Sequence, residues 1–306
     1  MAKYQEEYET CLVTYLYAGN DDEEFSYAQQ VIIHKLKECV GDSFKRKIIV
    51  ATLLKLRNEI SGEMGESVDT LFIKLGLLRY SLVKLRNKKW DVIAIGIKEL
   101  TQFKIRGIHK IIMNNINHPK KEVRKEMQIY LVHLYAFKGL DFLNILENSL
   151  SEWDQIQLLE VLQLTSDTQI ADLKPWLKSS NDSVVTFTLK LAKVYNQFEV
   201  KEELIELLNH KSEEVRINVI SALSHLHVAE AKNVLKNNFN KRSDEEQIAF
   251  LKMMENVYEK ADKPFLLEHI NHKNFEIKLI VSEILKNINF EELESNEAAL
   301  NESLTA

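Results

Sequence analysis

The pattern that decides the fold begins at residue 117 and reads NHPKKEVRKEMQIYL through residue 131. It recurs as NHKSEEVRINVISAL over residues 209–223 and as NHKNFEIKLIVSEIL over residues 271–285. Each copy starts with an Asn-His turn and continues with apolar residues spaced by four, as on one face of a helix. In chain order these residues are Val123, Met127 and Leu131; Val215, Val219 and Leu223; and Ile277, Val281 and Leu285.

Weaker copies of the same helix start lie between the clear ones. The apolar residues that open the helices are Val92, Val123, Ile156, Val184, Val215, Ile248 and Ile277, with spacings of 31, 33, 28, 31, 33 and 29 residues. A repeat of this length accommodates two helices of about 11–13 residues and two short turns. One such pair cannot bury its apolar face alone, so the units must stack. The sequence therefore predicts an all-α array of helical pairs.

The composition also favours helices. The 306 residues include only 8 Gly and 3 Pro, far below average usage of roughly 7% and 5%. Sheet-rich folds need many Gly and Pro turns, so we expect a helix content above ~65%, well over the base rate. No stretch approaches the ~18 apolar residues of a membrane-spanning helix, and the polar N-terminus has no signal-peptide pattern. Cys11 and Cys39 form no Cys-x-x-Cys pair, which favours a reduced, cytoplasmic setting.

The repeat divides the chain into three parts. Residues 1–81 contain helical patterns outside the repeat, and we expect them to form a helical N-terminal cap. Residues 82–288 form the array of about seven units. Residues 289–306 are acidic and lack a periodic apolar face, which predicts a flexible tail.

The units resemble HEAT repeats over residues 82–288. The resemblance rests on an Asn or Asp turn, on the pairs Val123-Arg124 and Val215-Arg216, and on small or apolar residues at three- and four-residue steps. The Arg position of the two degenerate copies, at Ile156 and Ile248, is occupied by Gln157 and Ala249. The resemblance implies a right-handed α–α superhelix of the HEAT-like or armadillo type.

A narrower resemblance links the chain to uncharacterised bacterial HEAT-repeat proteins. It is carried by LVKLRNKKW at residues 82–90 with GIKEL at 96–100, and by GLDFL at 139–143 with SEWDQIQLL at 151–159. Members of that group typically carry an N-terminal membrane helix, are often encoded beside a glycosyltransferase, and have no established catalytic residues. This sequence shows no such helix, so it is either a trimmed soluble part or a departure from the group. We expect a cytoplasmic protein, with membrane association a property of a longer native form.

Charge is distributed unevenly along the chain. Residues 34–126 sum to +11, whereas residues 1–33 sum to −6 and residues 127–306 to −11. Such segregation concerns partners rather than fold. The expected contacts to an anionic surface are Lys45, Arg46, Lys47, Lys84, Arg86, Lys88, Lys89, Lys120, Lys121, Arg124 and Lys125. A second basic group contains Lys104, Arg106 and Lys110, and ordinary solvated helix faces are the alternative for all of them.

His118, His210 and His272 follow Asn in three equivalent turns. They lie two or three units apart, and adjacent helix layers are ~8–10 Å apart, so they cannot share one metal ion. We interpret them as repeated turn residues with exposed rings. His225 with His227, and His269 with His272, have weaker claims to metal binding, and we expect no metal site.

Known catalytic motifs are absent from the sequence. There is no Gly-x-Ser-x-Gly, no phosphate-binding Gly-rich loop and no His-Glu-x-x-His. We therefore expect neither an enzyme nor a bound cofactor. Trp90-Asp91 and Trp153-Asp154 resemble the dipeptide of propeller blades, but they stand two repeats apart, and we expect the Trp rings to seal the junctions between units.

The function that fits these features is a non-catalytic scaffold or adaptor that binds a protein partner. Its basic N-terminal half would hold it at the cytoplasmic membrane surface through anionic lipids. The alternative is a nucleic-acid-binding solenoid that uses the basic segment 34–126. The −11 of residues 127–306 speaks against that alternative, because it would repel phosphate.

Overall fold

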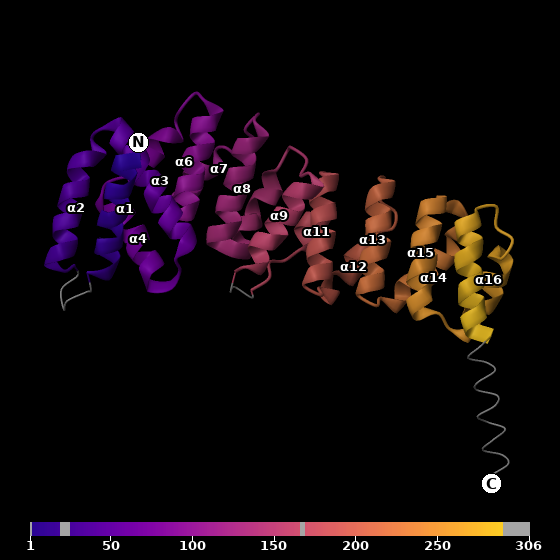
Figure 1. Cartoon of the computed structure of the whole chain (residues 1–306). Coiled ribbons are helices and arrows are strands. Elements are labelled where there is room, and N and C mark those ends of the chain that lie inside the picture. The colour runs from indigo at the N-terminus through magenta and orange to yellow at the C-terminus, as the bar shows by residue number, and fades with distance from the viewer. Residues whose placement is uncertain (1, 19–24, 166–168, 290–306) are drawn as a thin grey trace, which may run out of the picture. The chain divides into compact units, whose positions relative to one another are not determined.

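The computed structural model describes residues 2–18, 25–165 and 169–289, and the chain separates into two compact units. The first unit contains residues 1–148 and 152–171, and the second contains residues 149–151 and 172–306. Helices make up 76% of the described residues, and none of these residues lies in a β-strand. The predicted all-α fold of stacked helical pairs is therefore confirmed within each unit (Figure 1). Apart from Asn289, the predicted tail lies outside the described residues.

The first unit begins with four long helices, and from α5 onward short helices alternate with long ones. Its elements are α1 (Ala2–Tyr17), α2 (Tyr27–Val40), α3 (Ser43–Glu59), α4 (Gly62–Lys74), α5 (Leu78–Lys84), α6 (Trp90–Gln102), α7 (His109–Met113), α8 (Lys121–Tyr135), the 3₁₀ segment η1 (Ala136–Ile145) and α9 (Glu152–Gln163).

The second unit continues the same alternation. Its elements are α10 (Lys174–Leu177), α11 (Asp182–Val194), η2 (Phe198–Val200), α12 (Lys201–Leu207), α13 (Glu213–His225), α14 (Ala229–Asn237), η3 (Phe239–Lys241), α15 (Asp244–Val257), η4 (Lys260–Asp262), α16 (Lys263–His269) and a helix over residues 275–289.

The second helix of each repeat is here called the B helix. The B helices are α6, α8, α9, α11, α13, α15 and the helix 275–289, and they begin at residues 90, 121, 152, 182, 213, 244 and 275. Consecutive starts are therefore 31, 31, 30, 31, 31 and 31 residues apart. The period is more regular than the apolar residues of the sequence indicated.

The buried face of a B helix is set by its seventh and eleventh residues. These residues are buried in every B helix: Gly96 and Leu100, Met127 and Leu131, Leu158 and Leu162, Thr188 and Ala192, Val219 and Leu223, Phe250 and Met254, and Val281 and Leu285. They lie four residues apart, about one helical turn, so they form one continuous stripe. Gly96 is glycine because a Cβ there would lie 2.8 Å from the Cβ of Lys84 on α5.

Two of the predicted helix openings are wrong by two residues. Ile156 is 42% exposed, and Ile248 is only half-buried, because the equivalent third position of the B helix is Asp154 in α9 and Glu246 in α15. In both helices the next apolar residue along the chain is an isoleucine two positions later, which accounts for the difference. In α15 the position is as buried as the valines it replaces, since Glu246 is 2% exposed.

Two arginines stabilise the buried carboxylate of Glu246. Arg216 binds it with two hydrogen bonds, Nε to Oε1 at 2.8 Å and Nη2 to Oε2 at 3.0 Å, and Arg242 Nη1 donates to Oε1 at 2.8 Å. Burial raises the pKa of this carboxyl, but the hydrogen bonds from Arg216 and Arg242 outweigh burial and lower it to about 2. A buried charge of this kind is stable only while its partners remain.

The Arg of the repeat signature holds the turn that precedes its own helix. Arg124 Nη1 donates to the His118 carbonyl, and Arg216 Nη1 to the His210 carbonyl, both at 2.7 Å. Arg46 makes the equivalent bond to Val40 at 2.8 Å. The repeat contact thus begins at α3, inside residues 1–81, and the first compact unit joins the expected cap to the first repeats.

The arginine–glutamate cluster gives a testable expectation for stability. Arg216→Ala should lower the free energy of unfolding by about 3 kcal/mol in urea denaturation at pH 7, because it leaves a buried carboxylate with half its partners. Lys241→Ala, at an exposed lysine of the same unit, should change it by less than about 0.5 kcal/mol.

The same cluster predicts an acid dependence. The folded-state pKa of Glu246 lies below its ordinary value of 4.5, so its contribution is complete above that pH and is lost as pH falls toward about 2. The difference in the free energy of unfolding between wild type and Arg216→Ala should therefore become smaller as the pH falls from 4.5 to about 2. A gap that stays constant from pH 7 to pH 2 would contradict the role assigned to Glu246.

Candidate anion-binding surface

Three residues before five of the seven B helices, a side chain accepts a backbone hydrogen bond from the residue two positions later. The acceptors are the Nδ1 atoms of His118, His210 and His272, each at 3.1 Å from the next-but-one nitrogen, with Asn87 Oδ1 at 2.9 Å and Ser179 Oγ at 3.2 Å in two further repeats. The side chains of Asn, Ser and His differ in shape, but each provides a hydrogen-bond acceptor at this position. The repeated histidines are therefore turn residues, as expected, but their rings are half-buried rather than exposed.

The other histidines also have structural surroundings. His269 is 6% exposed; its Nδ1 donates to the Phe265 carbonyl at 2.8 Å and its ring packs against Phe239. His227 adopts φ +53 just after α13, a backbone position that glycine usually fills. Within the described ranges, no three His, Cys, Asp or Glu side chains stand close enough to hold a metal ion.

The predicted role of the tryptophans is wrong. Trp90 is 41% exposed and Trp153 is 62% exposed, so neither seals a junction. Both are the first or second residue of a B helix, where the side chain precedes the buried stripe. Trp176, which the sequence did not single out, is 3% exposed and packs in the core of the second unit.

The predicted anionic-surface contacts all lie in the first unit, where α3, α6 and α8 run parallel. Near their C-terminal ends, Gln102 Nε2 donates to Asn58 Oδ1 at 3.2 Å and Tyr130 Oη donates to the Ile105 carbonyl at 2.6 Å. Their N-terminal ends therefore share the opposite edge. Figure 1 allows these three helices to be followed side by side.

Four of the eleven predicted contacts are occupied within the fold. Arg46 and Arg124 hold turn carbonyls, as described above. Lys84 forms an ion pair with the buried Glu99, which also accepts from Ser81 Oγ. Lys45 Nζ lies 5.7 Å from the ring centre of Tyr4.

The other seven have no acidic partner in the described part of the chain. They are Lys47, Arg86, Lys88, Lys89, Lys120, Lys121 and Lys125, and all but the half-buried Lys125 are exposed. The first six lie in the turn before α6 or the first turns of α3 and α8, so we call them the basic edge. Asp91 and Glu122 stand in the same first turns, which leaves a positive excess.

At α6 and α8 the basic edge reverses the usual chemistry of a helix N-terminus, whereas α3 is capped in the ordinary way by Asp42. Lys89 and Lys120 occupy the N-cap positions of α6 and α8 and cap neither helix with a side chain. In the second unit the equivalent residues Asn181, Ser212 and Ser243 do accept first-turn N–H groups. Free N–H groups and the helix dipole favour anions at this end. Lysines there raise the cost of folding and strengthen the attraction for an external anion.

The negative charge does not extend evenly over the rest of the chain. Of the −11 carried by residues 127–306, −5 belongs to residues 290–306, outside the described part, −5 to residues 127–171, and −1 to residues 172–289. The charge polarity along the chain is therefore weaker than the sequence predicts: the first unit contains a basic segment, and the second unit is nearly neutral over residues 172–289. Within the described ranges, no helix combines the length and apolar content that crossing a bilayer requires.

The second unit contains a groove that the sequence did not indicate. It has a volume of about 730 Å³ and crosses α11, α13 and α15; it is lined by Lys193, Asn196, Ile217, Ser221, Ser224, His225, His227, Ala249, Lys252, Met253 and Asn256. These residues come from three consecutive repeats. Only the stacking of B helices brings them together, and no single repeat carries a motif for it.

Comparisons with known proteins leave the family open. No family model matches the chain, and neither does any curated protein. Solved structures similar to it include an engineered protein, at 13% identity over 92% of this chain and 88% of that one, with a TM-score of 0.39. Human deoxyhypusine hydroxylase in complex with glycerol is similar at 12% identity over 94% and 98%, with a TM-score of 0.35. At these TM-scores the similarity assigns neither family nor function, and the HEAT resemblance stays a prediction.

One expectation from the sequence is corrected. The absence of catalytic motifs predicts that the chain is not an enzyme, and that prediction is wrong as an exclusion, because human deoxyhypusine hydroxylase, one of the similar structures, is an enzyme. The similarity itself gives this chain no activity.

The repeated turn provides a direct test of the histidine role. His118→Asn should leave the free energy of unfolding within about 0.5 kcal/mol of wild type, because Asn87 already makes the same bond one repeat earlier. His118→Ala should lower it by about 1 kcal/mol, since the Lys120 N–H loses its acceptor. Equal losses for both variants in urea denaturation would show that ring packing, rather than the Nδ1 acceptor, matters.

Proposed function

We propose that this chain is a scaffold that binds a protein partner in the groove of the second unit. The observation that carries the proposal is the groove itself, which crosses three repeats without interruption. Neighbouring helices are about 8–10 Å apart, so three of them span about 16–20 Å. An extended segment of about six residues covers that length.

The lining suits a peptide chain. Ile217, Ala249 and Met253 provide an apolar floor, and amide, hydroxyl and imidazole groups stand around it. Asn196 and Asn256 are exposed and can bond to peptide N–H and C=O groups. A peptide held in this way satisfies its backbone without forming secondary structure.

The charges in the groove select among peptides. No acidic residue lines it, and two lysines do. Lys193 Nζ donates to Ser221 Oγ at 2.9 Å, which holds its ammonium in the groove, while Lys252 pairs with Glu276 at 2.9 Å. We therefore expect the bound segment to carry carboxylates.

The groove can be tested by site-specific crosslinking. A photoreactive amino acid in place of His225, in the groove, should crosslink a defined partner in the native host, whereas one in place of the exposed Asn233 on α14 should not. Ser221→Arg with Ser224→Arg fills the groove and should weaken binding of that purified partner at least tenfold. Asn233→Arg is the control, and equal affinity for both variants would contradict the proposal.

A second candidate function rests on the basic edge. We propose that this edge rests on an anionic membrane surface, since lysines near such a surface contribute about 1 kcal/mol each. The uncapped N-termini of α6 and α8 support this, because they offer free N–H donors beside the lysines. A flat edge of lysines on three helices fits a surface better than a single phosphate.

Vesicle binding tests the basic edge. Reversing Lys47, Lys88, Lys89, Lys120 and Lys121 to Glu should abolish binding to phosphatidylserine vesicles at 0.1 M salt. The matched control reverses five exposed lysines of the second unit, Lys178, Lys211, Lys241, Lys260 and Lys273, and should retain most of the binding. Equal loss would mean that only net charge matters. Binding to duplex DNA without vesicle binding would favour the nucleic-acid alternative.

A further inference from the structure

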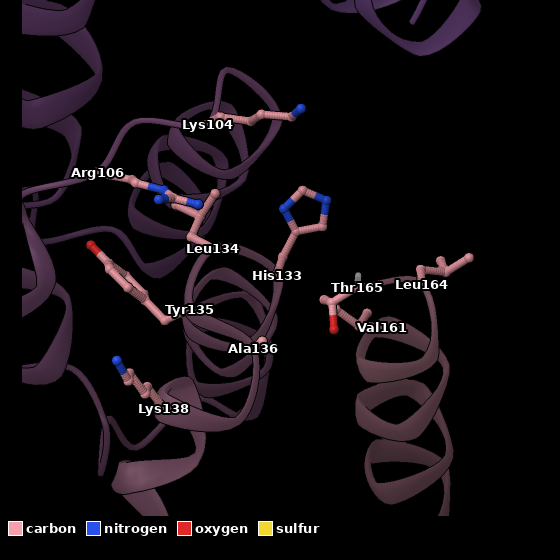
Figure 2. A pocket seen from close by; sticks show the side chains of 10 residues that line it. All are labelled: Lys104, Arg106, His133, Leu134, Tyr135, Ala136, Lys138, Val161, Leu164 and Thr165. Carbon is pink, nitrogen blue, oxygen red and sulfur yellow. The ribbon is translucent and has the colours of Figure 1, made fainter. Parts of the chain in front are cut away.

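A pocket in the first unit lies at the C-terminal ends of α6, α8 and α9, away from the basic edge. Its volume is about 530 Å³, within the range of about 300–1,000 Å³ typical of small-molecule sites. Figure 2 shows the ring of His133 rising from the end of α8 between Lys104 and the end of α9, where Leu164 and Thr165 lie across from it.

The charge of this pocket is one-sided. Lys104 and Arg106 come from the turn after α6, and Lys138 comes from η1. No acidic residue lines the pocket, and none of these three cations has an ion pair in the described part of the chain. Cations at helix C-termini are favoured by the dipole, so their presence alone is ordinary. Their gathering around one cavity, with no acidic side chain among its described lining residues, is the feature that needs an explanation.

The backbone of the turn places these cations at a cost. Lys104 adopts φ +49 at the end of α6, and the Ile105 N–H bonds to the Leu100 carbonyl at 2.9 Å, as in a Schellman turn. Glycine is the least strained residue at such a position. Gly76 fills the corresponding position after α4. A lysine after α6 therefore strains the backbone but places a positive charge in the pocket.

Two tyrosines of α8 fix this turn. Tyr130 Oη donates to the Ile105 carbonyl at 2.6 Å, and the Gly107 N–H donates to Tyr135 Oη at 3.3 Å. Tyr130 is fully buried, so its bond is shielded from water. Lys104 and Arg106 thus extend from a braced backbone, which reduces the entropy lost when a ligand is bound.

The pKa of His133 is affected by burial and by the positive charges around the pocket. Its pKa is lowered by burial first, then by the positive charges of Lys104 and Arg57. The imidazole is therefore neutral at pH 7 and can donate one N–H without adding charge. An anion is the species that this field attracts.

The opposite wall is apolar. Val161 of α9 lines the pocket together with Leu164, the residue just after the end of α9, and Leu164 is 86% exposed. An exposed leucine facing a group of cations suits a ligand with two different ends. The charged end would meet Lys104 and Arg106, and the organic end would cover Leu164.

We propose that this pocket binds a small phosphorylated organic molecule, with Lys104 and Arg106 on the phosphate and Leu164 against the organic part. Guanidinium and ammonium groups are the common protein partners of phosphate. The proposal is independent of the peptide groove, which lies in the other unit, and of the basic edge, which lies at the other end of α6 and α8.

Calorimetric titration of the full chain tests the pocket, with adenosine monophosphate, inorganic phosphate and adenosine as probes. Adenosine monophosphate should bind more tightly than inorganic phosphate, and adenosine should not bind. Arg106→Gln and Lys104→Gly should each weaken binding at least tenfold, while the exposed Lys110→Gln, a matched loss of one charge outside the pocket, should change it less than twofold.

The Lys104→Gly variant keeps the test independent of folding. Glycine relieves the positive φ, so its melting temperature should equal or exceed that of wild type while binding is lost. The ring resonances of His133 should shift on titration with adenosine monophosphate in wild type and stay unchanged in this variant. Absence of binding by any phosphorylated probe, or equal binding by Lys104→Gly and Lys110→Gln, would overturn the proposal.

The phosphate could belong to a free metabolite or to a lipid headgroup. Vesicles containing a phosphatidylinositol phosphate, tested on the five-lysine variant of the basic edge, distinguish the two sources. Binding that depends on Lys104 supports a lipid headgroup as the ligand, and binding of the soluble probe alone supports a free molecule. Failure with both contradicts the pocket proposal and leaves the groove proposal untouched.

Discussion

The structure depends on one hydrogen bond that recurs in the turn before five of the seven B helices. A side-chain acceptor three residues before the helix, such as His118 or His210, captures the N–H two residues later. This bond fixes where the helix begins, and the start fixes which residues face the core. Because the starts are 30 or 31 residues apart, the seventh and eleventh residues of each B helix form one stripe. A helix pair cannot bury this stripe alone, so the turn sets the stacking of the repeats.

The arginine of the turn shows how one side chain serves two interactions. Arg216 holds the His210 carbonyl and at the same time neutralises Glu246 in the next repeat. The contact links the start of α13 to the start of α15; Glu246 is shielded from water and Arg216 is half-buried. Arg124 makes the same turn bond, and the third position of the next B helix is again acidic, Asp154 in α9. At Glu246 an ion pair with Arg216 thus stands where Val123, Val184 and Val215 make apolar contacts in other repeats.

The two ends of α6 and α8 carry the same sign of charge for different physical reasons. At the N-terminal end, lysines oppose the helix dipole and are exposed. At the C-terminal end, cations agree with the dipole and surround a cavity. The first arrangement suits a broad anionic surface, and the second suits a compact anion. The single basic segment of the sequence thus separates into two sites at opposite ends of one pair of helices.

The sequence alone determined the fold class, the repeat and its length. Periodic apolar residues and the scarcity of Gly and Pro are local signals, and they predict helices whatever lies around them. The sequence also separated the turn histidines from metal ligands, because the repeat spacing keeps them apart.

The tertiary structure decided the register at Glu246, because a buried carboxylate is acceptable only when a partner from another repeat is present, here Arg216. It also decided which lysines are free. Lys84 forms an ion pair with Glu99, fifteen positions away, whereas Lys88 forms none among the described residues. The pocket beside Lys104 and the groove beside His225 combine side chains from separate helices. No linear pattern encodes them, since they exist only once the helices have stacked.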